Sequence, residues 1–234
     1  MKKLFMAAIM AAMVTACSVA GEKKTLKNVD VEALAKDTQV MLKDSGESHS
    51  AFAWWIPREF WASALFRDTT LQKYDKDKVL DMVSGISLLA VVEVDISASG
   101  GFTFYSKEEI DKNMTLFYID ADGSKQKLSP MQSIDPDLQY IFDAFKPILG
   151  SFIGKFGENL HFYVLNDKAD SSHRVLDPHQ KGQIEIQIAR AGRPVMKGSI
   201  EMPLDALFVP RKCANGKDAH ISWEYCPWSG EKLQ

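Results

Sequence analysis

The feature that most constrains this chain is its start, residues 1–17. Two lysines open it, residues 4–14 form an apolar run of eleven residues, and Thr15-Ala16 leads into Cys17. A helix that crosses a bilayer needs about twenty apolar residues, so this run is too short to be a permanent span. A charged start, a short apolar run and small residues are typical of a secretory signal. We therefore expect the folded part to begin after it, outside the cytoplasm.

The residues Val14-Thr15-Ala16-Cys17 resemble the lipobox of bacterial lipoproteins, in which an aliphatic residue and two small residues precede a cysteine. The resemblance implies cleavage after Ala16 and attachment of fatty acyl chains, such as palmitate, to Cys17, which would anchor the protein to a membrane. Ser18 follows the cysteine, and the resemblance then implies the outer membrane, facing the periplasm. Two alternatives are an ordinary secretory signal with a free Cys17, and cleavage near Ala20.

The remaining composition is that of a soluble globular protein. The chain has 234 residues, of which 46% are hydrophobic and 25% charged, close to the average for globular domains. After residue 16 it carries 26 basic and 31 acidic side chains. We expect no nucleic-acid partner, because phosphate binding requires a basic patch. Cys213 and Cys226 are the cysteines left after Cys17, and an oxidising compartment favours their pairing.

The hydrophobic pattern predicts an α+β fold. Helical spacing is expected over 29–42, 58–67, 75–87 and 137–157, and a capping box at Ser106 opens a further short helix. Strands follow one another while the helices are grouped, which favours a mostly antiparallel sheet with helices packed on one face. The expected strands are 88–96, 102–105, 114–119, 125–128, 160–165, 184–188, 195–200 and 207–209.

The chain divides into four parts by composition. Residues 1–16 are the signal peptide, and residues 17–28, small and charged without apolar periodicity, are expected to form a lipidated tether. Residues 29–209 carry the apolar periodicity of a single α+β domain. Residues 210–234 form a tail that contains both remaining cysteines, and we expect a small hairpin closed by a disulfide.

The densest aromatic passage lies between residues 51 and 66. Trp54, Trp55 and Trp61, with Arg58 as a polar contact, are candidate ligand-binding residues, because tryptophan rings form platforms for sugar rings and other apolar ligands. The alternative is that these rings belong to the core, since tryptophan and phenylalanine bury large areas there. The core interpretation is preferred.

The tail resembles a zinc ribbon, in which two Cys-x-x-Cys turns face one metal. The second turn, around Cys226-Pro227-Trp228-Ser229-Gly230, and the weaker first turn at Cys213 each lack their second cysteine. A structural zinc needs four ligands, and His220 would supply only a third, so we expect neither a metal nor another cofactor. In a ribbon the two remaining positions face each other, which implies that a Cys213–Cys226 disulfide replaces the metal. An unrelated two-cysteine hairpin is the alternative.

His173, Asp177 and His179 are the nearest approach to a metal or catalytic cluster, and they lie in a sequence typical of a polar loop. The chain contains no nucleophile elbow, His-Glu-x-x-His pair or phosphate-binding glycine loop. We therefore expect a membrane-anchored, non-catalytic module that binds a protein or small-molecule partner or supports the envelope. The alternative is a tethered hydrolase that uses His173, Asp177 and His179 or the Trp54-Trp55-Trp61 aromatics.

Overall fold

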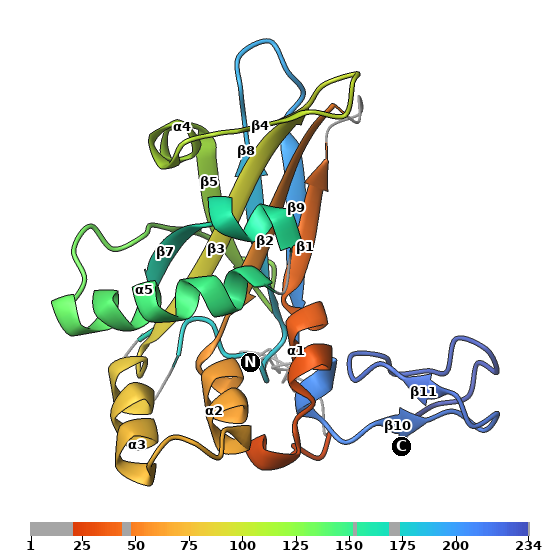
Figure 1. Ribbon diagram of the computed structural model, residues 1–234. Helices are drawn as coiled ribbons and strands as arrows, with labels where there is room; N and C mark the ends of the chain where they lie inside the picture. Colours follow the sequence, from red (N-terminus) through yellow and green to blue (C-terminus); the bar gives the residue numbers. More distant parts are fainter. Residues whose placement is uncertain (1–20, 44–47, 152–153, 169–173, 234) are drawn as a thin grey trace, which may run out of the picture.

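The computed structural model describes residues 21–43, 48–151, 154–168 and 174–233. Within these residues, nine strands form one large sheet in which every pairing is antiparallel (Figure 1). The path through the sheet is β4-β3-β2-β1-β9-β8-β5-β6, and β7 pairs with β3. The strands are β1 (Gln39–Lys43), β2 (His49–Ile56), β3 (Ile86–Ile96), β4 (Phe102–Phe104), β5 (Met114–Asp120), β6 (Lys125–Leu128), β7 (His161–Asn166), β8 (Gly182–Ile188) and β9 (Met196–Met202).

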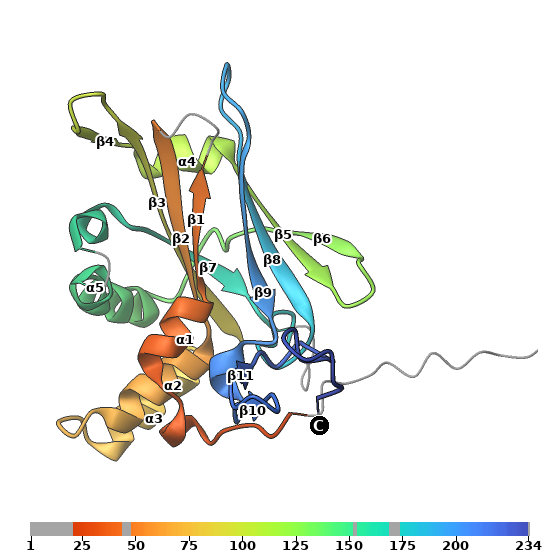
Figure 2. The ribbon, with the colours of Figure 1, turned by 90° about the vertical axis from the view of Figure 1, so that its right-hand side faces the viewer.

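The sheet folds back on itself as two leaves. One leaf contains β4, β7, β3, β2 and β1, the other contains β9, β8, β5 and β6, and they join where Lys43 pairs with Lys197 (Figure 2). Beyond β6, Pro130 forms a bridge with Leu165 of β7, and the Met131 N–H donates to the Val164 carbonyl at 2.8 Å. The path of hydrogen-bonded strands therefore returns to the leaf where it began.

Helices α1, α2, α3 and α5 lie beside the leaf that contains β1 to β3, whereas α4 lies at one end, between the two leaves (Figure 2). α5 crosses the outer face of β2 and β3, and the rings of Trp61 and Phe142 join α2 to α5 with centroids 6.2 Å apart. β2 is buried at every position because both of its faces are covered, whereas β8 alternates between buried and half-buried residues. The helices are α1 (Val31–Asp37), α2 (Arg58–Arg67), α3 (Lys73–Met82), α4 (Lys107–Asn113) and α5 (Pro136–Ser151).

This arrangement confirms the predicted α+β class and its mostly antiparallel sheet. The helix predicted over 58–67 has the same bounds in the structure, with Pro57 at its N-cap. The capping box predicted at Ser106 is present, because its hydroxyl accepts from the Glu109 N–H while the Glu109 carboxylate accepts from the Ser106 N–H. Short-range signals therefore placed these helix ends correctly.

The helix predicted over 29–42 is wrong in its second half. α1 ends at Asp37, and residues 39–43 form β1, which pairs along its whole length with β2. Thr38 sits at the junction, where its hydroxyl donates to the Leu34 carbonyl at 2.9 Å and accepts from the Trp54 indole at 3.1 Å. Pairing with β2, which lies later in the chain, overrides the helical spacing of residues 40–42.

Other boundaries also differ from the prediction. The helix predicted over 75–87 is α3, which ends at Met82, because the chain turns through Gly85 with a positive φ of 79° and β3 begins at Ile86. Over the strand predicted at 207–209, Leu207 ends a 3-10 helix, Asp205–Leu207, and Phe208 forms a single antiparallel bridge with Lys23.

A buried carboxylate ties the two leaves together. Glu93 of β3 is fully buried and accepts from Arg190, beyond the end of β8, through Nε at 2.6 Å and Nη2 at 2.8 Å. His49 Nε2 lies 2.7 Å from the same carboxylate. The guanidinium also covers the Tyr105 ring at 3.6 Å from its centroid. A buried ion is tolerated when it is paired and hydrogen-bonded on all sides, as Glu93 is.

We predict that Arg190→Ala lowers the free energy of unfolding by about 3 kcal/mol or more, because Glu93 then loses its bidentate partner while remaining buried. The matched control is Arg193→Ala, which removes a partly exposed ion pair with Asp95 and is expected to cost under about 1 kcal/mol. Urea unfolding of both variants measures the difference, and equal losses would contradict the structural role of Arg190.

Candidate functional site

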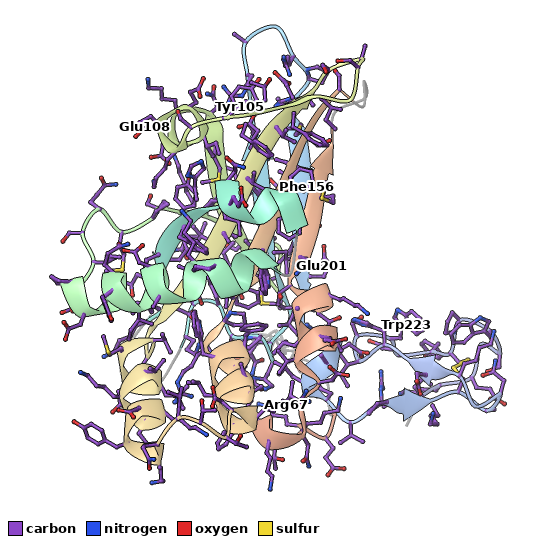
Figure 3. The ribbon with its side chains drawn as sticks, in the orientation of Figure 1. Arg67, Tyr105, Glu108, Phe156, Glu201 and Trp223 are labelled. Atoms are coloured by element: carbon purple, nitrogen blue, oxygen red, sulfur yellow. A yellow bond between two sulfur atoms is a disulfide. The ribbon has the colours of Figure 1, made fainter. Side chains whose placement is uncertain are left out.

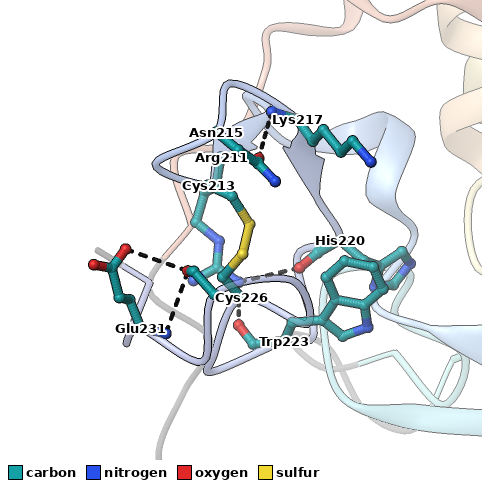
Figure 4. Close-up of a disulfide and its surroundings, with 9 residues drawn as sticks. Arg211, Cys213, Asn215, Lys217, His220, Trp223, Cys226 and Glu231 are labelled. Atoms are coloured by element: carbon teal, nitrogen blue, oxygen red, sulfur yellow. Dashed lines mark hydrogen bonds between the residues drawn. A yellow bond between two sulfur atoms is a disulfide. The ribbon is translucent and has the colours of Figure 1, made fainter.

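The C-terminal module, residues 210–233, projects from one end of the domain (Figure 1). Its two short strands, β10 (Arg211–Lys212) and β11 (Asp218–Ala219), pair antiparallel, and Cys213 is bonded to Cys226 with their Cα atoms 5.7 Å apart (Figure 4). The predicted disulfide is therefore confirmed.

Two similar turns carry the cysteines. The Gly216 N–H donates to the Cys213 carbonyl at 2.9 Å, and the Gly230 N–H donates to the Cys226 carbonyl at 2.8 Å. Both glycines have positive φ, 78° and 72°, a conformation that favours glycine. The turns face each other across the disulfide. Because each sulfur is bonded to the other, neither is a thiolate that could bind a metal. Among the described residues, no group of three His, Cys, Asp or Glu side chains could hold a metal.

The disulfide replaces the hydrophobic core that so short a segment cannot build. Its buried cluster contains only Cys213, Ala219 and Cys226, with Leu233 packed against them. Segments this small need a covalent or metal cross-link to hold their shape. The cross-link between residues thirteen apart in sequence contributes about 3 kcal/mol by the loop-entropy relation.

The module is fastened to the domain through Ile221. That side chain is buried in the main core, and its N–H donates to the Asp205 carboxylate at 2.7 Å. Arg211 secures the same loop, because its Nη2 donates to the carbonyls of His220 at 3.1 Å, Ile221 at 2.9 Å and Trp223. The start of the module is therefore held by the domain.

The first described residues of the chain lie against this junction. Lys23 bridges to Phe208, the Lys24 N–H donates to the Leu207 carbonyl at 2.9 Å, and the Val209 N–H donates to the Glu22 carbonyl at 2.8 Å. We call residues 21–24 the N-terminal strand. A methyl group on Gly21 would lie 2.2 Å from Ile221 Cδ1 and 2.9 Å from Phe208 Cδ1, so any larger residue here would have to displace these side chains. From residue 21 onward, the chain assigned to the tether is therefore packed against the domain.

A groove of about 780 Å³ separates the module from the nearer ends of β5, β8 and β9. Figure 3 labels Glu201 on the sheet side and Trp223 on the module side. The walls combine basic, acidic and aromatic side chains, namely Lys181, Arg211, His220 and Lys232 with Asp120, Glu201, Glu224 and Trp223. A concave site with polar groups that converge from several elements is typical of a binding site.

The structure places the candidate aromatic residues in the core. Trp54 and Trp55 have no exposed surface and Trp61 has 3%. Trp54 packs edge-on against Phe60 with centroids 5.4 Å apart, and Arg58, at the start of α2, is half-buried. No ring face of these three tryptophans is open to a ligand, so they do not form the platform that the ligand-binding interpretation requires. Their burial agrees with the core interpretation.

The candidate polar cluster is only partly within the described residues, because His173 lies outside them. Asp177 and His179 lie in one turn, where Asp177 Oδ1 is 3.2 Å from His179 Nδ1 and accepts from the His179 N–H at 2.9 Å. The His179 ring packs against the Phe208 ring, 5.7 Å away. Burial opposes ionisation of Asp177, but the hydrogen bonds from His179 outweigh it and lower the pKa of Asp177 to about 2.

Comparison with known proteins gives no relative: no family model, no curated protein and no solved structure matches this chain. Within the described residues, the helices are all too short or too polar to cross a bilayer. The interpretation of the site therefore depends on its own geometry and chemistry.

We predict that Asp177→Asn lowers the free energy of unfolding by about 2 kcal/mol at pH 7, because the folded state then loses the ionised group that it stabilises. A folded-state pKa below the unfolded value contributes stability above about pH 4, and this contribution is lost as the pH falls toward 2. The difference between wild type and variant should therefore shrink over that range in urea unfolding.

The control is Glu224→Gln, an exposed carboxylate at the groove, which should change stability by less than about 0.5 kcal/mol at any pH. A pH-independent effect of Asp177→Asn would contradict the electrostatic role of Asp177.

Proposed function

We propose that this protein is a lipid-anchored, non-catalytic module of the bacterial cell envelope that binds a partner in the groove beside its C-terminal module. The lipobox-like sequence ending at Cys17, which lies outside the described residues, supports the anchor. The Cys213–Cys226 disulfide supports an oxidising compartment, since structural disulfides are rare in the cytosol. Ser18 after the cysteine favours the outer membrane, facing the periplasm.

The observation that carries this proposal is the docking of the N-terminal strand. Gly21 is packed against Ile221, and only four peptide units separate it from Cys17. Four extended residues span at most about 14 Å. An acyl-anchored Cys17 would therefore hold the domain close to the lipid surface, with the C-terminal module and its groove at the membrane-proximal end.

The side chains that line the groove favour binding of a partner over hydrolysis. Its polar groups come from β5, β8 and β9, from the residue before β8 and from the C-terminal module, so a partner would contact both parts of the protein at once. In contrast, Asp177 and His179 bond to each other in a turn packed on Phe208. The mixture of basic and acidic side chains suits a polar protein segment or a polar small molecule. No cofactor is needed for such binding.

We predict that Cys17→Ala abolishes incorporation of radioactive palmitate and releases the protein from the membrane fraction, because two or three acyl chains are needed for stable attachment. The matched control replaces both other cysteines, Cys213→Ser with Cys226→Ser, and should keep the label. A wild-type protein without label, or one that stays on membranes after Cys17→Ala, would contradict the lipid anchor.

We also predict that a photo-crosslinking residue at position 201 captures a discrete partner in cells, whereas the same residue at position 197 does not. Both positions are exposed and lie on the same face of β9, but only Glu201 lines the groove. Lys181→Glu in the groove should remove the adduct by reversing a charge that faces the partner. Equal adducts at 201 and 197, or an adduct that is indifferent to Lys181→Glu, would contradict the groove as the binding site.

A further inference from the structure

The tryptophans of this chain fall into two sets. Trp54, Trp55 and Trp61 are buried, while Trp223 is 38% exposed and Trp228 49% exposed, both on the C-terminal module. Tyr225, between them in sequence, is 55% exposed. We call Trp223, Tyr225 and Trp228 the aromatic patch. Such large rings gain from burial, so an exposed group of them on a small module indicates a surface that is covered in use.

The patch is ordered by contacts among its own members and neighbours. The rings of Trp223 and Trp228 meet edge to face with centroids 5.9 Å apart, and the His220 ring lies 6.0 Å from that of Trp223. Lys217 Nζ lies 4.8 Å from the centroid of the Trp228 ring. Tryptophan and tyrosine beside lysine is the combination that proteins place at the boundary between lipid and water, where the ring meets the acyl region and the ammonium meets phosphate.

The end of the molecule that carries the C-terminal module is more basic than the rest. The N-terminal segment 21–28 and the module together carry seven basic and four acidic side chains, whereas residues 29–209 carry 19 basic and 27 acidic ones. The lipid surface of bacteria is negatively charged, and each basic side chain near such a surface contributes about 1 kcal/mol of attraction. The end that carries the aromatic patch is therefore the end that an anionic surface attracts.

The position of Gly21, the first described residue, indicates what covers the aromatic patch. Gly21 contacts Ile221, two residues before Trp223 in the module, and Cys17 lies four peptide units before Gly21. We infer that the aromatic patch lies against the phospholipid headgroups and is a second contact with the membrane beside the lipid on Cys17. This inference rests on the proposed anchor. The acyl chains supply attachment, and the patch fixes the orientation of the domain, which in turn fixes how the groove faces the membrane.

The test uses the mature protein purified with its lipid and reconstituted into vesicles of phosphatidylcholine and phosphatidylglycerol whose acyl chains carry bromine. Bromine quenches tryptophan emission only at contact distance, and three of the five tryptophans are buried. We expect quenching in the wild type and a loss of that quenching in Trp223→Phe with Trp228→Phe, where only core rings emit.

The matched control adds Tyr140→Trp to that double variant. Tyr140 is 76% exposed and belongs to α5, a helix that lies away from the module (Figure 1), so the new tryptophan should emit without quenching. Quenching at position 140 as strong as that of the wild type would show an unoriented domain and overturn the inference. A circular-dichroism spectrum unchanged between the variants shows that they share one fold.

Mass spectrometry of Cys17 separates the two proposals. A lipidated, vesicle-bound protein without quenching overturns the patch as a membrane contact and leaves the anchor standing. A dimer that shields the rings, detected by sedimentation, likewise overturns the patch as a membrane contact. A chain without lipid that still floats with the vesicles and is quenched overturns the anchor and supports the patch. A chain without lipid that neither floats nor is quenched overturns both.

Discussion

The docking of the N-terminal strand is the constraint on which the arrangement of this protein depends. Lys23 pairs with Phe208, and Gly21 packs closely against Ile221, where a side chain would displace the isoleucine. These contacts bring together residues that are nearly two hundred positions apart in sequence. They join the start of the domain, its last buried segment and the C-terminal module at one place. Whatever holds Cys17 therefore also determines where the module and the groove lie.

The Cys213–Cys226 disulfide and the docking of the N-terminal strand both hold the C-terminal module in place. Ile221 fixes one loop of the module in the main core, and the Cys213–Cys226 bond holds the remainder, which has almost no core of its own. A reducing compartment would remove that bond and release the turns that carry the exposed aromatic rings. The redox chemistry of the compartment and the shape of the module's surface are thus linked.

Helix ends could be predicted from the sequence where interactions within a few residues determine them. Pro57 and the capping box at Ser106 mark helix ends through backbone geometry and hydrogen bonds within a few residues. It failed over residues 39–43, because β1 is specified by pairing with β2, which local spacing does not encode. The two cysteines of the tail were enough to predict its disulfide, which the structure contains. The groove could not be predicted, since Glu201 and Trp223 meet only after the sheet has folded and Arg211 has fixed the intervening loop. The signal available in the sequence was the pair of tryptophans beside the cysteines, Trp223 and Trp228, whose exposure only the structure shows.

The central claim is that the domain stands directly on the membrane, with its C-terminal module toward the lipid. Neutron reflectometry of the lipidated protein on a supported bilayer measures this most directly, because it gives the protein density as a function of height. We expect protein density to begin at the headgroups, with the narrow module below the wide sheet. A water layer thicker than the reach of the four-residue connection, about 14 Å, would contradict this claim.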